Sequence, residues 1–141
     1  MFLRRGHAYI YFSYGNHFML NVSAEIAGIG GGVLVRALQP LEGIAHMEKH
    51  RKTTRLLDLT RGPGRLASAL RIDRSLDGVD LCSPGPLWLG AIVLPARSAQ
   101  SASGLLLGKS PRIGITRAAD RLLRFYERDS PFVSGSRTLR T

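Results

Sequence analysis

The sequence has one cysteine and no long apolar segment, and both shortages limit what the protein can be. A single cysteine, Cys82, excludes an internal disulfide bond and a zinc site built from several cysteines. No uninterrupted apolar run reaches the roughly 18 residues of a membrane-spanning helix. Residues 1–5 also lack the charged-then-apolar order of a signal peptide. We therefore expect a protein of the reducing cytoplasm that does not act on a membrane.

Acidic residues are also scarce, and their scarcity indicates the kind of partner. The chain has 10 Asp and Glu against 20 Lys and Arg, which gives a net charge of +10, and most of the cations are arginines. Guanidinium groups fit phosphate oxygens in a two-pronged geometry that ammonium groups cannot match. The charge balance favours a polyanionic partner such as nucleic acid, although a basic surface can also serve solubility alone.

The chain begins with two segments rich in aromatic and branched residues, 7–14 and 17–23, which predict a β-hairpin. Gly15 and Asn16 between them give the turn signal. A two-residue turn would place Tyr11 and Asn21 on opposite faces of the hairpin. A bulged or odd-length tip near Asn16 would instead set Tyr11 across from Asn21, with Tyr14 close to the tip. The sequence leaves this register open.

The rest of the chain predicts separate helices and strands. We expect a strand over 33–38, a helix from Pro40 to about residue 52, and a shorter helix after Gly62-Pro63-Gly64 with Leu66, Ala69 and Leu70 facing inward. Further strands are expected at 87–89, 92–94, 112–115 and 123–126, a surface loop at 95–111, and a basic, frayed end from residue 134. With 141 residues there is room for one domain of the α+β class with a mainly antiparallel sheet.

Several residues could carry chemistry. Tyr11 and Tyr14 are spaced so that one ring could stack on an extruded base while the other wedges into a duplex, although strand tyrosines often pack in a core instead. Arg36 stands in an apolar run and needs a partner for its charge. Gly62, Gly64 and Arg65 at a helix start could meet a phosphate, or could form only a turn and a cap. The histidines show no metal-site spacing.

These residues lie in segments that together resemble the alkyladenine (3-methyladenine) DNA glycosylase family of the mammalian type, which bacteria also contain. The similar segments are GHAYIYFSYG (6–15), NV (21–22), VLVRALQPLEG (33–43), GPGRLASAL (62–70), PRIGI (111–115), RFY (124–126) and SPFVS (130–134). They follow the family's order along nearly the whole chain. The resemblance implies a curved antiparallel sheet flanked by short helices, a glycosylase domain over 1–134, and a basic, disordered tail over 135–141.

The resemblance also implies roles for individual residues. In the base pocket, Tyr11 would stack on the flipped base, and Asn21 would crowd out the 2-amino group of guanine. Tyr14 would intercalate into the minor groove. Arg36 and the carbonyl of Ile113 would hold the catalytic water. The residues expected to contact DNA are Tyr14, Arg74, Gly62, Gly64 and Arg65.

The family's catalytic glutamate stands in a Glu-x-Tyr segment upstream of these motifs, and residues 1–141 contain no match for it. From the resemblance we expect an enzyme that releases alkylated or deaminated purines from double-stranded DNA, as a monomer at the bacterial nucleoid, without a metal or organic cofactor. We expect this chain to lack the N-terminal catalytic segment and to be weak or inactive. A non-catalytic protein that recognises lesions or kinked duplex, or an RNA-binding module, remains an alternative.

Overall fold

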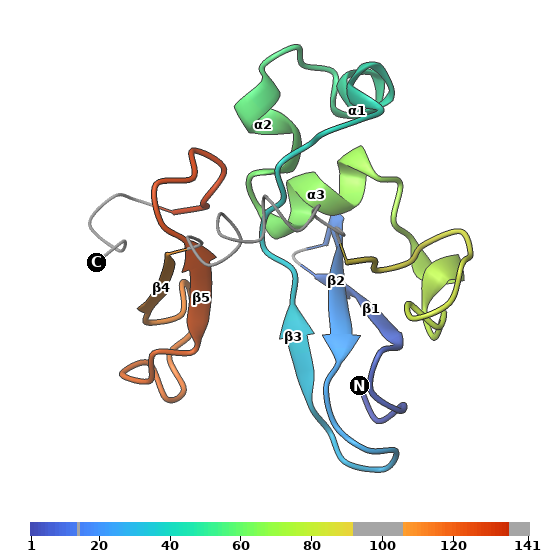
Figure 1. The fold of residues 1–141 in the computed structure, drawn as a ribbon, viewed down its shortest axis with the longest axis vertical. Helices are drawn as coiled ribbons and strands as arrows, with labels where there is room; N and C mark the ends of the chain where they lie inside the picture. The colour runs from blue at the N-terminus through green and yellow to red at the C-terminus, as the bar shows by residue number, and fades with distance from the viewer. Residues whose placement is uncertain (14, 92–105, 136–141) are drawn as a thin grey trace, which may run out of the picture. The chain divides into compact units, whose positions relative to one another are not determined.

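The computed structural model describes residues 1–13, 15–91 and 106–135, and the chain divides into two compact units. The N-terminal unit is Met1–Ala91 and the C-terminal unit is Ile92–Thr141. Helices and antiparallel sheets occur in separate stretches of sequence (Figure 1), so the predicted α+β class is confirmed. Among the described residues, no helix has the length and apolar character needed to cross a bilayer.

A three-stranded antiparallel sheet forms the base of the N-terminal unit. Its strands are β1 (Ala8–Ser13), β2 (His17–Ser23) and β3 (Gly32–Leu34), in the order β1-β2-β3. Ser13 pairs with His17, so three residues connect β1 to β2. Of the two registers that the sequence left open, the structure thus has the odd-length tip and not the two-residue turn. The pairing of Tyr11 with Asn21 that accompanied this alternative is not found.

The observed register is centred on Gly15 rather than on Asn16. Tyr9 consequently lies across from Asn21, and Tyr11 lies across from Met19. Because side chains alternate along a strand, these four residues still share one face of the hairpin. Tyr11 and Asn21 are thus diagonal neighbours on the same face of the hairpin, as a common pocket would require.

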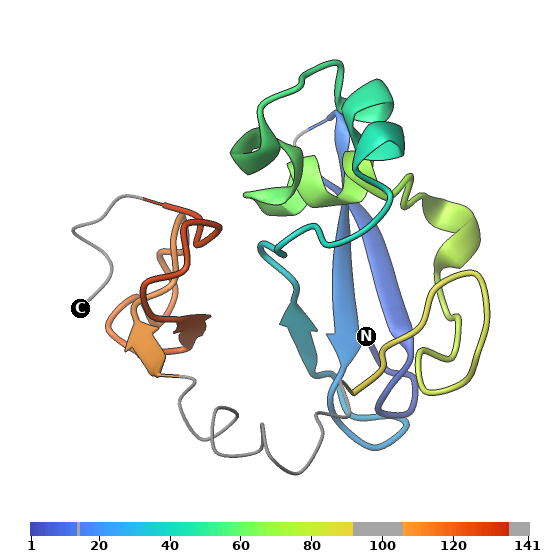
Figure 2. The same cartoon turned by 45° about the horizontal axis from the view of Figure 1, so that its top comes forward.

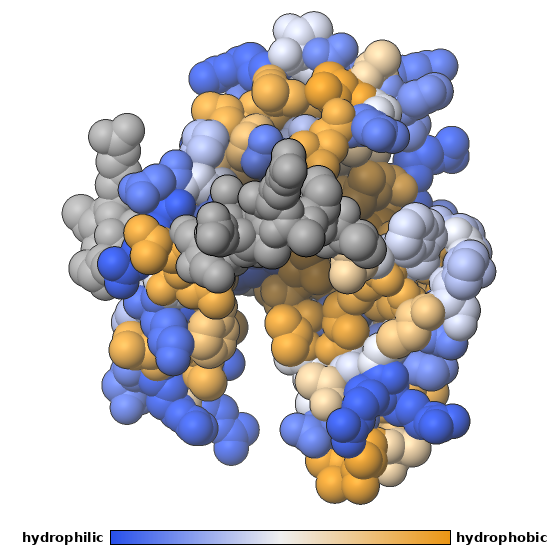
Figure 3. Space-filling model, in the orientation of Figure 1, coloured by the Kyte–Doolittle hydropathy of each residue, from blue (hydrophilic) through white to orange (hydrophobic). Residues whose placement is uncertain are grey.

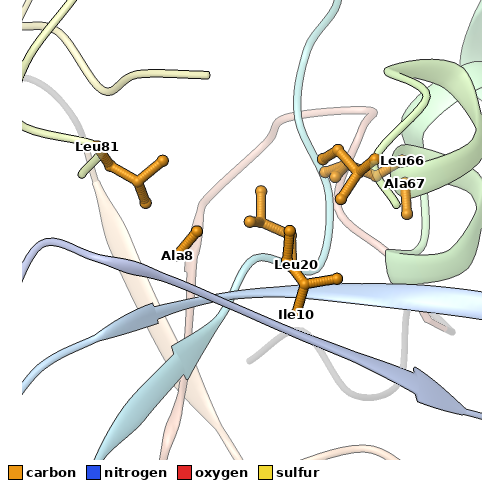
Figure 4. Packing of buried hydrophobic residues seen from close by; sticks show 7 residues of the cluster. Ala8, Ile10, Leu20, Leu66, Ala67 and Leu81 are labelled. Atoms are coloured by element: carbon orange, nitrogen blue, oxygen red, sulfur yellow. The ribbon is translucent and has the colours of Figure 1, made fainter. Parts of the chain in front are cut away.

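The core of this unit lies between the opposite face of the hairpin and helix α3 (Pro63–Ala69). Ala8, Ile10 and Leu20 of the strands pack with Leu66 and Ala67 of α3 (Figure 4). The other buried members of this cluster are Ile72 and Leu81. Proline at the first helical position favours the helix start, because its missing N–H would have no partner there. The predicted helix with Leu66 and Ala69 inward is confirmed.

The outer edge of β1 is closed by residues 74–81 rather than by another strand. The N–H of Ala8 donates to the Val79 carbonyl (2.8 Å), and the Gly78 N–H donates to the Ala8 carbonyl (3.0 Å). At Ile10 the closure uses side chains, since the Ile10 N–H donates to the Asp77 carboxylate at 2.7 Å. Asp77 therefore satisfies a donor on a fully buried strand residue.

Replacing Asp77 by alanine should destabilise the protein by about 1–3 kcal/mol, because the buried Ile10 N–H would lose its acceptor. Urea denaturation of residues 1–141 measures the change. Asp77→Asn is the matched control, since the amide oxygen can still accept the hydrogen bond and should preserve most of the stability. Equal stability of the alanine variant and the unaltered chain would contradict this role.

Three predicted elements of the N-terminal unit differ from the structure. The strand expected over 33–38 ends at Leu34, so Arg36 lies beyond it. The helix expected from Pro40 is α1 (Ile44–Arg51), because Gly43 directly before it adopts a left-handed conformation with φ 67°. Glu42 therefore lies outside the helix. A short helix, α2 (Leu56–Thr60), was not expected, and residues 87–89 form no strand.

The C-terminal unit contains a two-stranded antiparallel sheet of β4 (Leu107–Ser110) and β5 (Arg124–Glu127). The strand predicted near 123–126 is thus found, but 107–110 is a strand where a loop was expected. Residues 112–115 contain a turn instead of the predicted strand, since Gly114 has a positive φ of 70°. The strand predicted at 92–94, most of the loop predicted at 95–111 and the end of the chain over 136–141 lie outside the described residues.

Large apolar side chains remain exposed where β2 passes to β3. Ile26 and Ile29 in this connection are 55% and 51% exposed, and Val33 of β3 is 60% exposed. Figure 3 shows orange atoms at this tip, at the lower end of the view. The helices lie at the other end of the sheet in both ribbon views (Figures 1 and 2). One end of the N-terminal unit therefore exposes apolar side chains, and the other end carries the helices.

Candidate active site

The aromatic part of the candidate site lies on β1. The rings of Tyr9 and Tyr11 are tilted by 35° with centroids 5.5 Å apart, and both side chains are half-buried. Tyr9 thus packs beside the ring that is expected to stack on a base. A ring held by a neighbouring ring offers a flat apolar surface with little freedom to lose on binding. Tyr14 lies outside the described residues.

Asn21 is held rigidly on β2. Its side chain is buried, with 7% of the residue exposed, and its amide nitrogen donates to the carbonyls of Tyr9 (3.1 Å) and Met19 (3.3 Å). Both acceptors are backbone atoms of the hairpin, so the register that pairs Tyr9 with Asn21 also fixes this amide. The Asn21 side chain is therefore a fixed polar group on the face of the hairpin that carries Tyr11.

Arg36 lies in the segment that follows β3. The segment is tied down on both sides, since the Val35 N–H donates to the Leu20 carbonyl at 3.0 Å and Ala37 bridges to Arg61. The side chain is half-buried, and its Nε has no hydrogen-bond partner among the described residues. A buried donor left unpaired is costly, so this nitrogen is suited to a bound water or ligand atom.

Ile113 belongs to the C-terminal unit, whereas Arg36 belongs to the N-terminal unit. It stands in the turn before Gly114, and its side chain occupies the space that a Cβ at Gly135 would need. Gly135 has a positive φ of 90°, so both geometry and contact favour glycine there. This packing fixes the turn that carries the Ile113 carbonyl.

The glycines at the start of α3 have different surroundings. Gly62, with φ 141° and ψ 146°, directly precedes the helix. Gly64 is buried, and a Cβ there would come within 2.7 Å of the His17 ring. Gly64 therefore serves the close contact of α3 with β2. Arg65 follows it and pairs with Asp58, with 2.6 Å between Nη1 and Oδ1.

Arg74 is exposed and begins the short 3-10 helix η1 (Arg74–Leu76). Its Nη1 donates to the Ile10 carbonyl at 3.4 Å, so it contacts the same peptide edge as Asp77. Asp73 caps η1, and hydrogen bonds from the hydroxyl and N–H of Ser75 hold the pKa of Asp73 below its ordinary value. The position expected to contact DNA is thus attached to the strand between Tyr9 and Tyr11.

No role was predicted for Arg124, although it stands, like Arg36, in an apolar stretch of the sequence. Arg124 is 5% exposed, and it donates to the Ser110 hydroxyl (2.8 Å) and the Ser134 carbonyl. Its guanidinium lies 4.8 Å from the centroid of the Tyr126 ring. These contacts join β4, β5 and the segment after them, so Arg124 has a structural role.

Among the described residues, no group of three or more His, Cys, Asp or Glu side chains could hold a metal ion.

Residues 1–131 match the family model described as methylpurine-DNA glycosylase (MPG). The match extends over most of the chain and contains Tyr11, Asn21, Arg36 and Ile113. This chain belongs to the methylpurine-DNA glycosylase family.

Bacterial relatives support the same assignment. A protein of Mesorhizobium japonicum is 60% identical over 139 residues, which are 99% of this chain and 63% of the relative. Proteins of Paraburkholderia phytofirmans and Granulibacter bethesdensis are 45% and 47% identical, again over 99% of this chain and over 62% and 63% of their own lengths. All three are named "Putative 3-methyladenine DNA glycosylase". The chain thus spans about three-fifths of the length of these curated relatives.

Proposed function

We propose that this chain supplies the base-binding and much of the DNA-binding surface of a 3-methyladenine DNA glycosylase. The observation that carries the proposal is the face of the hairpin on which the half-buried Tyr11 stands beside the rigid amide of Asn21. An enzyme that acts on a base within a duplex must extrude it and hold it by stacking and by contacts to its edge. Tyr11 provides the stacking surface, and Asn21 provides the edge that rejects a 2-amino group.

The reaction we propose is hydrolysis of the N-glycosidic bond of alkylated or deaminated purines in double-stranded DNA. Water adds to C1′, the bond from C1′ to the purine nitrogen breaks, and a general base takes the proton from the water. Arg36 would orient the water through its Nε, which has no hydrogen-bond partner among the described residues. The family resemblance assigns to the Ile113 carbonyl a hydrogen bond from the same water. We assign no metal or organic cofactor to this reaction. We place the protein at the nucleoid, as a monomer and away from membranes.

A second candidate is a non-catalytic protein that recognises lesions or kinked duplex. The net charge of +10 supports this candidate, because it favours duplex binding whether or not a base is released. Both candidates require binding to damaged duplex. Only the enzyme releases the base.

Duplex binding should fall steeply with salt. The net charge of +10 predicts that several phosphates are neutralised, and the logarithm of the affinity changes by about −0.9 per phosphate for each tenfold rise in salt. With about four phosphates, affinity should drop roughly 100-fold when salt rises fourfold. Fluorescence anisotropy with a hypoxanthine-containing duplex and a matched undamaged duplex measures the slope and the preference. The proposal fails if neither duplex binds at low salt or if binding does not depend on salt.

A further inference from the structure

Three arginines contact Asp58 of α2, two of them at its carboxylate and one at its backbone carbonyl. Arg65 of α3 is 2.6 Å from Oδ1, and Arg55, directly before α2, is 3.4 Å from Oδ2. Arg51 at the end of α1 donates from Nη2 to the Asp58 backbone carbonyl at 3.5 Å. A single carboxylate therefore stands against three guanidinium groups, and the cluster keeps an excess of positive charge.

The surrounding sequence increases this excess. Residues 48–65 contain six cationic side chains and two anionic ones, a net charge of +4 without histidines. Figure 3 shows hydrophilic side chains along both margins of the helical end of the N-terminal unit, at the top of the view. Positive charge is therefore dense in residues 48–65, in and around the three helices.

Arg51 shows that the cluster is not electrostatically complete. Burial and the nearby charge of Arg65 lower the pKa of Arg51, and Asp58 only partly opposes them. The Nε of Arg51 is buried and has no hydrogen-bond partner among the described residues. An anion between these groups would supply the missing acceptor and reduce the repulsion between the two arginines.

The cluster is attached to two parts of the candidate active site. The start of α3 packs on the hairpin through the contact of Gly64 with His17, just beyond the tip. Arg61, between α2 and α3, bridges to Ala37, the neighbour of Arg36. Figures 1 and 2 both show α1, α2 and α3 at the end of the sheet where β1 passes to β2, with the N-terminus at the other end. A strand of DNA held at the hairpin tip would therefore meet the cluster.

We propose that Arg51, Arg55 and Arg65 form a phosphate-binding surface for the backbone of duplex DNA, with Asp58 as an internal competitor. In the free protein Asp58 holds the guanidinium groups of Arg55 and Arg65, and on binding it yields them to a phosphate. The proposal rests on the proposed function and adds a site to it. Phosphodiesters suit the cluster because guanidinium forks bind phosphate oxygens in pairs.

The test compares two substitutions that should act in opposite directions. Asp58→Asn removes the competitor and should tighten binding to an undamaged duplex about 3- to 10-fold at low salt. Arg55→Gln removes a cation and should weaken binding about 3- to 10-fold, with the salt slope smaller by about one phosphate. Arg55→Lys should recover part of the affinity. Arg5→Gln is the matched control, because Arg5 is an exposed arginine that precedes β1 and lies outside the helical segments.

The side chain of Arg55 is 84% exposed, so its replacement should leave the fold intact, which thermal unfolding checks. Weaker binding by a folded Asp58→Asn variant would show that the carboxylate merely supports the structure, and it would overturn the proposal. Effects of Arg55→Gln equal to those of Arg5→Gln would overturn it as well, while leaving the proposed function intact. If the unaltered chain binds no duplex at low salt, both the phosphate surface and the proposed function fail.

Discussion

Residues 1–141 by themselves should release hypoxanthine from a duplex at no more than trace rates. Arg36 and the Ile113 carbonyl are the groups proposed to orient the catalytic water, but neither can accept its proton near neutral pH, because arginine stays charged and a carbonyl is a very weak base. A positioned general base contributes about 10²- to 10⁴-fold to such a reaction. Hypoxanthine is a neutral leaving group and depends on that help, whereas cationic 7-methylguanine or 3-methyladenine leaves more readily.

Adding an N-terminal segment that carries Glu-x-Tyr should raise hypoxanthine release by at least about 100-fold. Single-turnover excision from a hypoxanthine-containing duplex measures both polypeptides under the same conditions. Tyr14→Ala serves as the binding control, since it should weaken duplex binding without supplying a base. Full turnover by residues 1–141 would show that another carboxylate takes the proton, and the assignment of the site would then be wrong.

Replacing Leu66 by alanine should destabilise the N-terminal unit by about 2–5 kcal/mol. Leu66 is fully buried in α3, where it packs against Ile10 and Leu20 of the hairpin. The substitution removes apolar contacts and leaves a cavity at the junction between the helix and the strands that carry Tyr11 and Asn21. Urea denaturation gives the free energy of unfolding, and the midpoint should shift without a change in slope.

Leu56→Ala provides the matched control for this prediction. Leu56 begins the neighbouring helix α2 and is 43% exposed, so its truncation should change stability by about 0.5 kcal/mol or less. Duplex binding should weaken for Leu66→Ala once the temperature approaches its lowered melting point, and should remain normal for Leu56→Ala. Similar losses of stability in both variants would place the core of this unit elsewhere.

The hairpin shows how far sequence reasoning reached. Aromatic and branched residues on both sides of Gly15-Asn16 were enough to predict the two strands and an odd-length tip as one of two registers. Neither the centre of the tip nor the pairing of Tyr9 with Asn21 followed from the pattern. A shift of the turn by one residue changes every cross-strand pair, and contacts such as that of His17 with Gly64 lie outside the hairpin itself.

Arg36 and Arg124 show the same limit for the site. Both stand in apolar segments, and for both the sequence indicates only that a buried charge needs a partner. The structure gives Arg124 the Ser110 hydroxyl, the Ser134 carbonyl and the Tyr126 ring. It leaves the Nε of Arg36 without a hydrogen-bond partner among the described residues. The difference comes from chain segments that are distant in sequence.

By itself, the sequence determined the family, the basic character and the α+β class, and it predicted the residues of the base pocket, because these depend on composition and on short ordered motifs. Only the tertiary structure decided how those residues are held. The closure of β1 by Asp77 and Arg74 and the grouping of three arginines around Asp58 join segments separated by loops. Such contacts depend on how distant parts of the chain pack in space, which local sequence propensities do not determine.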